Sequence, residues 1–245
     1  KDLPDKIEKN MAARMEQKQK ELYHAHAQRL ALMLQNQTEE EFADSRFQVL
    51  SELTRLRQLC CDPALVYENY EGGSAKLDLC IELIQSAVES GHKILLFSQF
   101  TSMIEILTAR LQEESISCFV LQGSTKKEQR AQMVEQFNRD DTSVFCISLK
   151  AGGTGLNLTG ADIVIHYDPW WNVAVENQAT DRAHRIGQKN VVTVYKLIAK
   201  GTIEEKIIKL QQMKKELAEE ILSGDEIKTA SFQREELLEL LEERF

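Results

Sequence analysis

The chain has 245 residues, 42% of them hydrophobic and 28% charged, and its formal net charge at pH 7 is −9. This apolar content excludes an intrinsically disordered chain and is sufficient for a buried core. The acidic balance excludes a protein that coats nucleic acid over its whole surface, so any DNA contact must be a local patch.

Hydropathy and cysteine usage indicate the compartment of the protein and the state of its thiols. The apolar runs have strand length, far short of a membrane span, and no secretion signal opens the chain, which predicts a soluble intracellular protein without a membrane partner. The odd number of cysteines and the lack of a C-x-x-C pair favour reduced thiols over disulfides or zinc. His24 and His26 point to different faces of a predicted helix, so we expect no metal site.

The N-terminal part of the chain has a helical pattern. Residues 5–35 are rich in Ala, Met, Leu, Gln, Glu and Lys and contain neither Gly nor Pro, which predicts one long helix. Thr38 is followed three residues later by Glu41, the pattern of a capping box, which predicts a second helix through Leu59 before the Asp-Pro pair at 62–63. The two helices together suggest a helical hairpin.

From residue 75 onward, helical and strand patterns alternate. The predicted strands are mostly continuous apolar stretches, typical of a parallel sheet covered on both faces, so we expect a doubly wound α/β fold. Such sheets bind ligands beyond the carboxyl ends of their strands. The predicted helices are 75–90, 101–113, 125–138, 173–185 and 202–222, and the predicted strands are 93–98, 117–121, 143–148, 162–167 and 191–198. The loops expected at the ligand-binding edge are 98–100, 122–125, 149–155 and 168–172.

Two arginines lie close together in the segment 178–188, QATDRAHRIGQ. Spacings of four and three place Gln178, Arg182 and Arg185 on one face of the predicted helix. A guanidinium is planar and permanently charged and matches phosphate oxygens, as a site that stabilises a transferring phosphoryl group requires. Surface arginines paired with nearby acids are the alternative that spacing alone leaves open.

A glycine-rich segment, SLKAGGTGLNLT at 148–159, directly follows a predicted strand. Glycines allow main-chain N–H groups to approach a phosphate or nucleotide closely, although a tight turn explains the pattern equally well. The segment is not a Walker A loop, because Leu156 and Asn157 stand where Lys-Ser or Lys-Thr would follow the last glycine.

Both tryptophans of the chain lie in the segment 167–172, YDPWWN, just ahead of the helix predicted for the arginines. Tryptophan at the end of a strand either packs against a DNA-binding element or fills the core, and spacing does not separate these possibilities.

In this order and spacing, the three segments resemble motifs V and VI of the Swi/Snf-type branch of the superfamily 2 helicases. KILLFSQF at 93–100 resembles motif IV of these proteins, and LQGST at 121–125 the DNA-contacting loop that follows. LRQLCCDP at 56–63 resembles the opening segment of their second lobe, and LPDK at 3–6 the stretch that leaves their first lobe. One departure is Val173, where many relatives have proline.

The resemblance implies a RecA-like doubly wound, mostly parallel sheet with helices on both faces, an N-terminal helical hairpin and C-terminal brace helices. It divides the chain into a helical linker or protrusion over residues 1–70, the second RecA-like lobe over 71–222 and a brace helix over 223–245. Lack of long insertions between Gly73 and Gly201 favours a bacterial host, hence the nucleoid rather than a nucleus.

In enzymes of this type, two lobes close on ATP and the second contributes arginine fingers. The sequence contains no G-x-x-x-x-G-K-[ST] and no D-E-x-H, so we expect ATP and Mg²⁺ to be bound mainly by an absent first lobe, and the chain alone to be inactive. The resemblance implies catalytic roles for Arg182 and Arg185, with Arg185 as the leading finger. The implied nucleotide-binding residues are Gly153, Gly155, Gln178 and Asp181.

The resemblance also implies three partners: double-stranded DNA, the N-terminal RecA-like lobe, and a DNA-bound protein that is displaced or remodelled. DNA would be held through its phosphates without strand separation. The candidate DNA contacts are Ser98, Gln99, Gly123, Ser124, Thr125, Lys150, Thr154 and Trp171. A binding module without a catalytic partner lobe is the alternative, whereas a dinucleotide-binding enzyme is disfavoured because the glycine fingerprint is missing.

Overall fold

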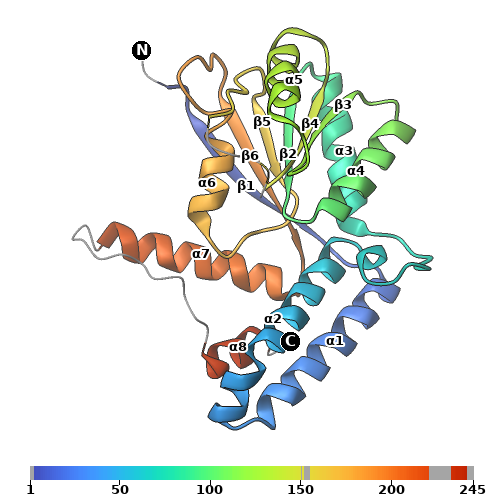
Figure 1. The fold of residues 1–245 in the computed structure, drawn as a ribbon, viewed down its shortest axis with the longest axis vertical. Helices are drawn as coiled ribbons and strands as arrows, with labels where there is room; N and C mark the ends of the chain where they lie inside the picture. The colour runs from blue at the N-terminus through green and yellow to red at the C-terminus, as the bar shows by residue number, and fades with distance from the viewer. Residues whose placement is uncertain (1–2, 150, 152–154, 221–232, 242–245) are drawn as a thin grey trace. The chain divides into compact units, whose positions relative to one another are not determined.

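The computed structural model describes residues 3–149, 151, 155–220 and 233–241 (Figure 1). By packing, the chain divides into two compact units. The first comprises residues 1–13 and 75–198, and the second comprises residues 14–74 and 199–245. The predicted site residues Lys150, Gly153 and Thr154, and residues 223–232 and 242–245 of the predicted brace, lie outside the described residues.

The first unit contains a six-stranded sheet in the order β1-β6-β5-β2-β4-β3. The pairings that join β6, β5, β2, β4 and β3 are parallel, with Leu95 of β2 opposite Val164 on one side and Phe145 on the other. The strands are β1 (Lys6–Ala13), β2 (Ile94–Ser98), β3 (Cys118–Leu121), β4 (Val144–Ser148), β5 (Ile163–His166) and β6 (Val192–Ala199). The doubly wound fold predicted from the sequence is confirmed, and five of the strands lie where the apolar stretches predict them.

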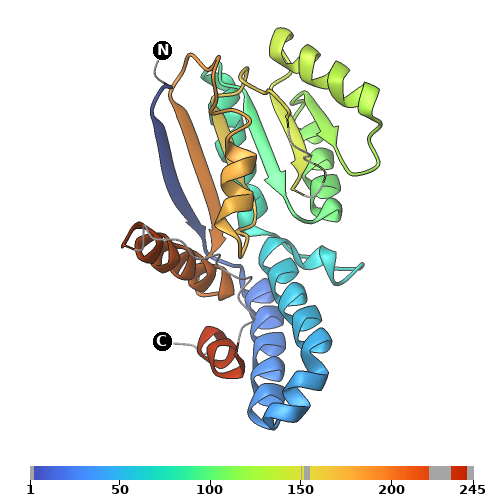
Figure 2. The same cartoon turned by 60° about the vertical axis from the view of Figure 1, so that its left-hand side comes forward.

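The predicted long helix over 5–35 is wrong in its first part. Residues 6–13 form β1, an edge strand that runs alongside β6, and the N–H of Val192 donates to the carbonyl of Asp5 at 3.1 Å (Figure 2). Most β1 side chains are exposed and several are Lys or Glu, which suits a strand at the edge of a sheet. Helix propensity is overridden because β6 supplies hydrogen-bond partners from a distant part of the chain.

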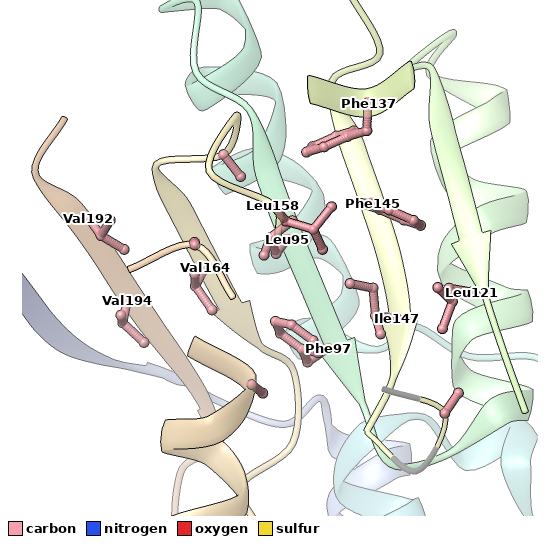
Figure 3. Close-up of a cluster of buried hydrophobic side chains, with 14 residues drawn as sticks. Leu95, Phe97, Leu121, Phe137, Phe145, Ile147, Leu158, Val164, Val192 and Val194 are labelled. Atoms are coloured by element: carbon pink, nitrogen blue, oxygen red, sulfur yellow. The ribbon is translucent and has the colours of Figure 1, made fainter. Parts of the chain in front are cut away.

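Helices cover the sheet. Its apolar strands have this composition because their side chains are buried in the hydrophobic core. Phe137 and Ala179, from α5 and α6, join Leu95 and Phe97 of β2 in one buried cluster (Figure 3). The alternate residues of β2 are also fully buried, so both faces of this strand are covered. Of the remaining helices, α4 contacts β2, β3 and β4, and α3 contacts β1 and α4. The helices of this unit are α3 (Ala75–Glu89), α4 (Thr101–Glu113), α5 (Lys127–Arg139) and α6 (Val173–Thr180).

The second unit is helical. Its elements are α1 (Gln17–Gln35), α2 (Glu39–Cys61), the short 3₁₀ helix η1 (Pro63–Leu65), α7 (Ile203–Glu220) and α8 (Arg234–Leu241). The predicted hairpin is confirmed, because α1 and α2 pack against each other. The predicted capping box is also present: Thr38 Oγ1 accepts from the N–H of Glu41 at 3.3 Å, and the Glu41 carboxylate accepts from the N–H of Thr38 at 2.8 Å.

Two further features concern the chain as a whole. The five cysteines, all among the described residues, form no disulfide, and four of them are buried. Within the described ranges, no helix combines the length and the apolar character that crossing a membrane requires.

Candidate functional site

The segment that carries the two arginines leaves the helix earlier than its spacing predicts. Helix α6 begins after Asn172, whose side chain accepts from the N–H of Ala174 at 2.9 Å, and it ends at Thr180, whereas the predicted helix runs to residue 185. Residues 181–187 form turns. The carbonyl of Arg182 accepts from the N–H of Leu158 at 2.9 Å, which draws the backbone out of the helix. The prediction that Gln178, Arg182 and Arg185 share one helix face is therefore wrong.

Gln188 fixes the far end of these turns. Its amide nitrogen donates to the carbonyls of Ala161 at 2.8 Å, Ala183 at 3.0 Å and Thr159 at 3.3 Å. Its amide oxygen accepts from the N–H groups of residues 189–190 at 2.9 and 3.0 Å. Because Gln188 is buried and bonded on both sides of its amide, the turns between α6 and β6 are held to the segment that precedes β5.

The turns nevertheless gather most of the predicted nucleotide-site residues around one pocket of about 580 Å³. The predicted residues that line it are Gly155, Gln178, Asp181, Arg182 and Arg185, and the remaining lining residues are Leu3, Leu156, Asn157, His184 and Ile186. Arg182 and Arg185 thus line one pocket because of the turns and not because of helical periodicity. Of the four loops expected at the ligand-binding edge, only 149–155 contributes to this pocket, through Gly155.

The two arginines have different surroundings. Arg182 is 5% exposed, and its guanidinium carbon lies 5.4 Å from the centroid of the Phe97 ring. Burial lowers the pKa of Arg182 to about 10, so the group still carries its charge at neutral pH. Arg185 is exposed, and its Nη1 donates to the carbonyl of Leu156 at 3.3 Å. Arg185 is therefore the arginine that an incoming group can reach.

Gly155 has a positive φ of 104°, in the region that favours glycine, and a Cβ at this position would meet nothing within 4 Å. Backbone conformation, rather than lack of space, therefore explains glycine at this edge of the pocket.

Ser98 and Gln99 lie at the carboxyl end of β2 and are buried. The Ser98 hydroxyl donates to the Asp168 carboxylate at 2.6 Å, and the N–H of Gln99 donates to the same carboxylate at 3.3 Å. Asp168 thus ties the loop after β2 to the loop after β5. Trp171, three residues beyond Asp168, is half-buried.

The turn after β3 carries the other described DNA candidates. Gly123 and Ser124 are exposed and Thr125 is half-buried. Thr125 Oγ1 accepts from the N–H of Gln122 at 3.0 Å, and the N–H of Thr125 donates to the carbonyl of Gln122 at 3.1 Å. This turn and the pocket are distinct, because none of its residues lines the pocket.

Several residues of the site were not predicted. Phe97 lies under Arg182, Gln188 holds the turns, and Nε2 of His184 lies 2.7 Å from the carbonyl oxygen of Pro4. Gln188 and His184 fall within the segment 178–188, so their position in this motif is the sequence signal that could have marked them as site residues. Their contacts are mostly with main-chain carbonyls, which leave no residue-type pattern in a sequence.

Comparisons with known proteins match this chain to helicases and to SWI2/SNF2 ATPases. The family described as Helicase conserved C-terminal domain matches residues 75–187. An uncharacterized ATP-dependent helicase of Mycoplasma pneumoniae is 41% identical over 246 residues, which cover 99% of this chain and 23% of that protein. The chain spans about a fifth of the length of the curated relatives that it matches first.

Two solved structures from Sulfolobus solfataricus are similar to the chain. The SWI2/SNF2 ATPase C-terminal domain is 33% identical with a TM-score of 0.73, and the match covers 90% of this chain and 91% of that domain. The SWI2/SNF2 ATPase core in complex with dsDNA is 34% identical with a TM-score of 0.75, and the match covers 89% of this chain and 46% of that core.

Proposed function

Because the chain belongs to the SWI2/SNF2 family of helicase-like ATPases and forms their C-terminal RecA-like lobe, we propose that it is the second half of an ATP-dependent translocase. The complete protein moves along double-stranded DNA and remodels protein–DNA complexes. Names of relatives support this proposal, since one is named a putative ATP-dependent helicase/translocase and others are named chromatin-remodeling ATPases.

The observation that carries the proposal is the pocket that an exposed and a buried arginine both line. Two permanent positive charges suit the γ-phosphate of ATP, whose charge must be stabilised as the phosphoryl group leaves. Arg185 is the finger because its side chain is exposed, and Arg182, held on Phe97, fixes the positive potential behind it. Gln178 and Asp181 orient the arginines, while Gly155, with Gly153, shapes the nucleotide edge.

ATP and Mg²⁺ enter this proposal as ligands held mainly by the first lobe. The sequence offers neither a Walker A lysine nor a D-E-x-H segment, so the chain contributes positive charge but not the groups that hold the metal. Hydrolysis therefore requires both lobes, and the chain alone is inactive.

DNA lies against the turns at the carboxyl ends of the strands in this proposal. Gly123 and Ser124 are exposed and offer backbone and hydroxyl groups to phosphates, contacts that do not depend on base sequence. Ser98 acts indirectly, because it is fully buried and bonded to Asp168. Gln99 is likewise buried and bonded to Asp168, so it also acts indirectly. The remaining proposed contacts are Thr125, Lys150, Thr154 and Trp171.

The proposed division of labour follows the expected segments. Residues 71–222 form the catalytic lobe, to whose sheet residues 6–13 add the edge strand β1. The helices within residues 1–70 form the linker or protrusion, and residues 223–245 form the brace.

The test compares the complete protein with the isolated chain. ATP hydrolysis is measured without DNA, with duplex DNA and with single-stranded DNA, and movement is followed by displacement of the third strand of a triplex. We expect duplex-stimulated hydrolysis and triplex displacement by the complete protein, no duplex unwinding, and no hydrolysis by the chain. A complete protein that binds duplex DNA but hydrolyses no ATP would instead be a binding module, and the proposal would be rejected.

A further inference from the structure

Arg130, on α5, contacts four main-chain carbonyls with one guanidinium. Its Nε donates to Thr125 O at 2.8 Å, and its Nη2 donates to Gly123 O at 3.1 Å and Gln122 O at 3.3 Å. Its Nη1 donates to Ala151 O at 3.0 Å. The first three carbonyls belong to the turn after β3, and the fourth belongs to the glycine-rich segment after β4.

We infer that Arg130 is a positioning residue that couples the turn 122–125 to Ala151 after β4, and so holds the exposed Gly123 and Ser124 in place against the DNA backbone. This inference rests on the proposed function, which assigns DNA contacts to Gly123 and Ser124. Arg130 itself acts through these carbonyls and not by touching DNA.

The geometry of the turn supports this role. Gln122 and Thr125 close it through two hydrogen bonds of 3.0 and 3.1 Å, and its carbonyls are directed at Arg130. The exposed residues Gly123 and Ser124 remain available to solvent or to a ligand. The carbonyls of the turn thus bond to Arg130, while Gly123 and Ser124 remain accessible.

The anchor after β4 is equally well defined. Ala151 is buried, and its N–H donates to the carbonyl of Ser148 at 3.0 Å, while the N–H of Leu149 donates to the carbonyl of Ser98 at 2.9 Å. Strands β3 and β4 are parallel neighbours, so their carboxyl ends meet at one edge of the sheet. Arg130 therefore joins the buried Ala151 after β4 to an exposed turn after β3.

Only arginine provides this connection. Its planar fork presents five N–H donors in fixed directions, and four bonds use the three nitrogens together, whereas lysine concentrates its donors on one atom. Arg130→Lys therefore keeps the charge and removes most of the bridge.

Arg139, on the same helix, is the matched control. Its side chain is 77% exposed and forms an ion pair with Glu135 at 2.7 Å, one helical turn away. Arg139→Lys changes the same chemistry on the same helix without touching either segment.

The experiment measures ATP hydrolysis by the complete protein as a function of duplex DNA concentration. For Arg130→Lys we expect the DNA concentration at half-maximal stimulation to rise about tenfold, as the loss of charge-assisted hydrogen bonds would allow. The rate without DNA and the KM for ATP should stay at their wild-type values, and Arg139→Lys should match wild type throughout. If Arg130→Lys shows the same DNA dependence as Arg139→Lys, the inference is overturned.

Hydrogen exchange of the complete protein distinguishes coupling from general loosening of the fold. In Arg130→Lys we expect faster exchange at the amides of Thr125 and Ala151, and unchanged exchange in the middle of α5. Equal acceleration throughout α5 would mean that Arg130 only stabilises its helix, which overturns the inference as well.

Arg185→Ala in the same assay tests the proposed function separately. Loss of turnover in Arg185→Ala together with wild-type DNA dependence in Arg130→Lys rejects the coupling alone. Unchanged turnover in Arg185→Ala rejects the arginine-finger role in the proposed function and leaves the coupling by Arg130 to be judged from its own DNA dependence.

Discussion

The guanidinium of Arg182 lies over the ring of Phe97, with 5.4 Å between the guanidinium carbon and the ring centroid. The same ring stacks with His166, at 5.5 Å between centroids and an interplanar angle of 21°. Phe97 thus connects the end of β2 to the segment that lines the arginine pocket. A cation over an aromatic face stabilises its position by about 0.5–2 kcal/mol, depending on how far it is removed from water.

Phe97→Leu should lower ATP turnover by the complete protein, because Arg182 loses the aromatic face that orients it. Phe145→Leu is the control, since Phe145 is an equally buried phenylalanine of the same core and packs against Phe119 and Phe137. Each substitution should lower the free energy of unfolding by about 0.5–3 kcal/mol. Turnover that falls equally in both variants would show that core packing, and not the contact with Arg182, is responsible.

His166 makes the stability of the lobe depend on pH. Burial lowers the pKa of this fully buried histidine from its usual 6.5 to about 4, against the opposing influence of Glu176. As pH falls from 6.5 towards 4, the unfolded chain takes up a proton on His166 that the folded chain does not. The free energy of unfolding should therefore fall by about 3 kcal/mol over this range on account of His166 alone.

Urea unfolding of wild type and His166→Gln at about pH 7 and about pH 4.5 checks this prediction. We expect the variant to lose less stability on acidification than wild type, by roughly 2–3 kcal/mol. Identical losses in the two proteins would contradict a neutral buried His166.

The buried Glu176 forms an ion pair with the half-buried Lys196 and supports the tryptophan loop. Their charged atoms lie 2.8 Å apart, Glu176 is 1% exposed, and its carboxylate also accepts from the N–H of Trp170 at 2.7 Å. Lys196→Met should lower the free energy of unfolding by about 3–5 kcal/mol, because a buried carboxylate then loses its cation.

The double variant Lys196→Met with Glu176→Gln should regain most of this loss, since glutamine keeps an oxygen for Trp170 without the charge. Chemical denaturation of the two variants and wild type provides the comparison. A double variant as unstable as Lys196→Met would show that the cost arises from packing and not from the lone charge.

The alternation of elements from residue 75 onward was predictable because it follows from burial. Strands covered on both faces, such as β2 at Ile94–Ser98, are continuously apolar, and the helices between them keep their own period. Residues 6–13 were mispredicted because their helix-favouring composition is overridden by pairing with β6, far away in the chain.

The candidate site was predictable in its residues and not in its geometry. Arg182 and Arg185 do line one pocket, yet α6 ends at Thr180, and the hydrogen bond between Leu158 and Arg182 that turns the backbone joins two segments that are separate in sequence. Arg130 was missed for a related reason. Its partners are main-chain carbonyls, which every residue type carries, so no sequence pattern marks them.

The most direct test of the account is single-turnover ATP hydrolysis by the complete protein, with duplex DNA present, for wild type and Arg185→Ala. Arg110→Ala is the control, because Arg110 lies on α4 and pairs with Glu113 and Glu114. An arginine finger predicts that Arg185→Ala hydrolyses ATP roughly 10³-fold more slowly or worse, with ATP and duplex binding retained and Arg110→Ala at the wild-type rate. An unchanged rate in Arg185→Ala would contradict the account, since the exposed arginine of the pocket would then have no part in phosphoryl transfer.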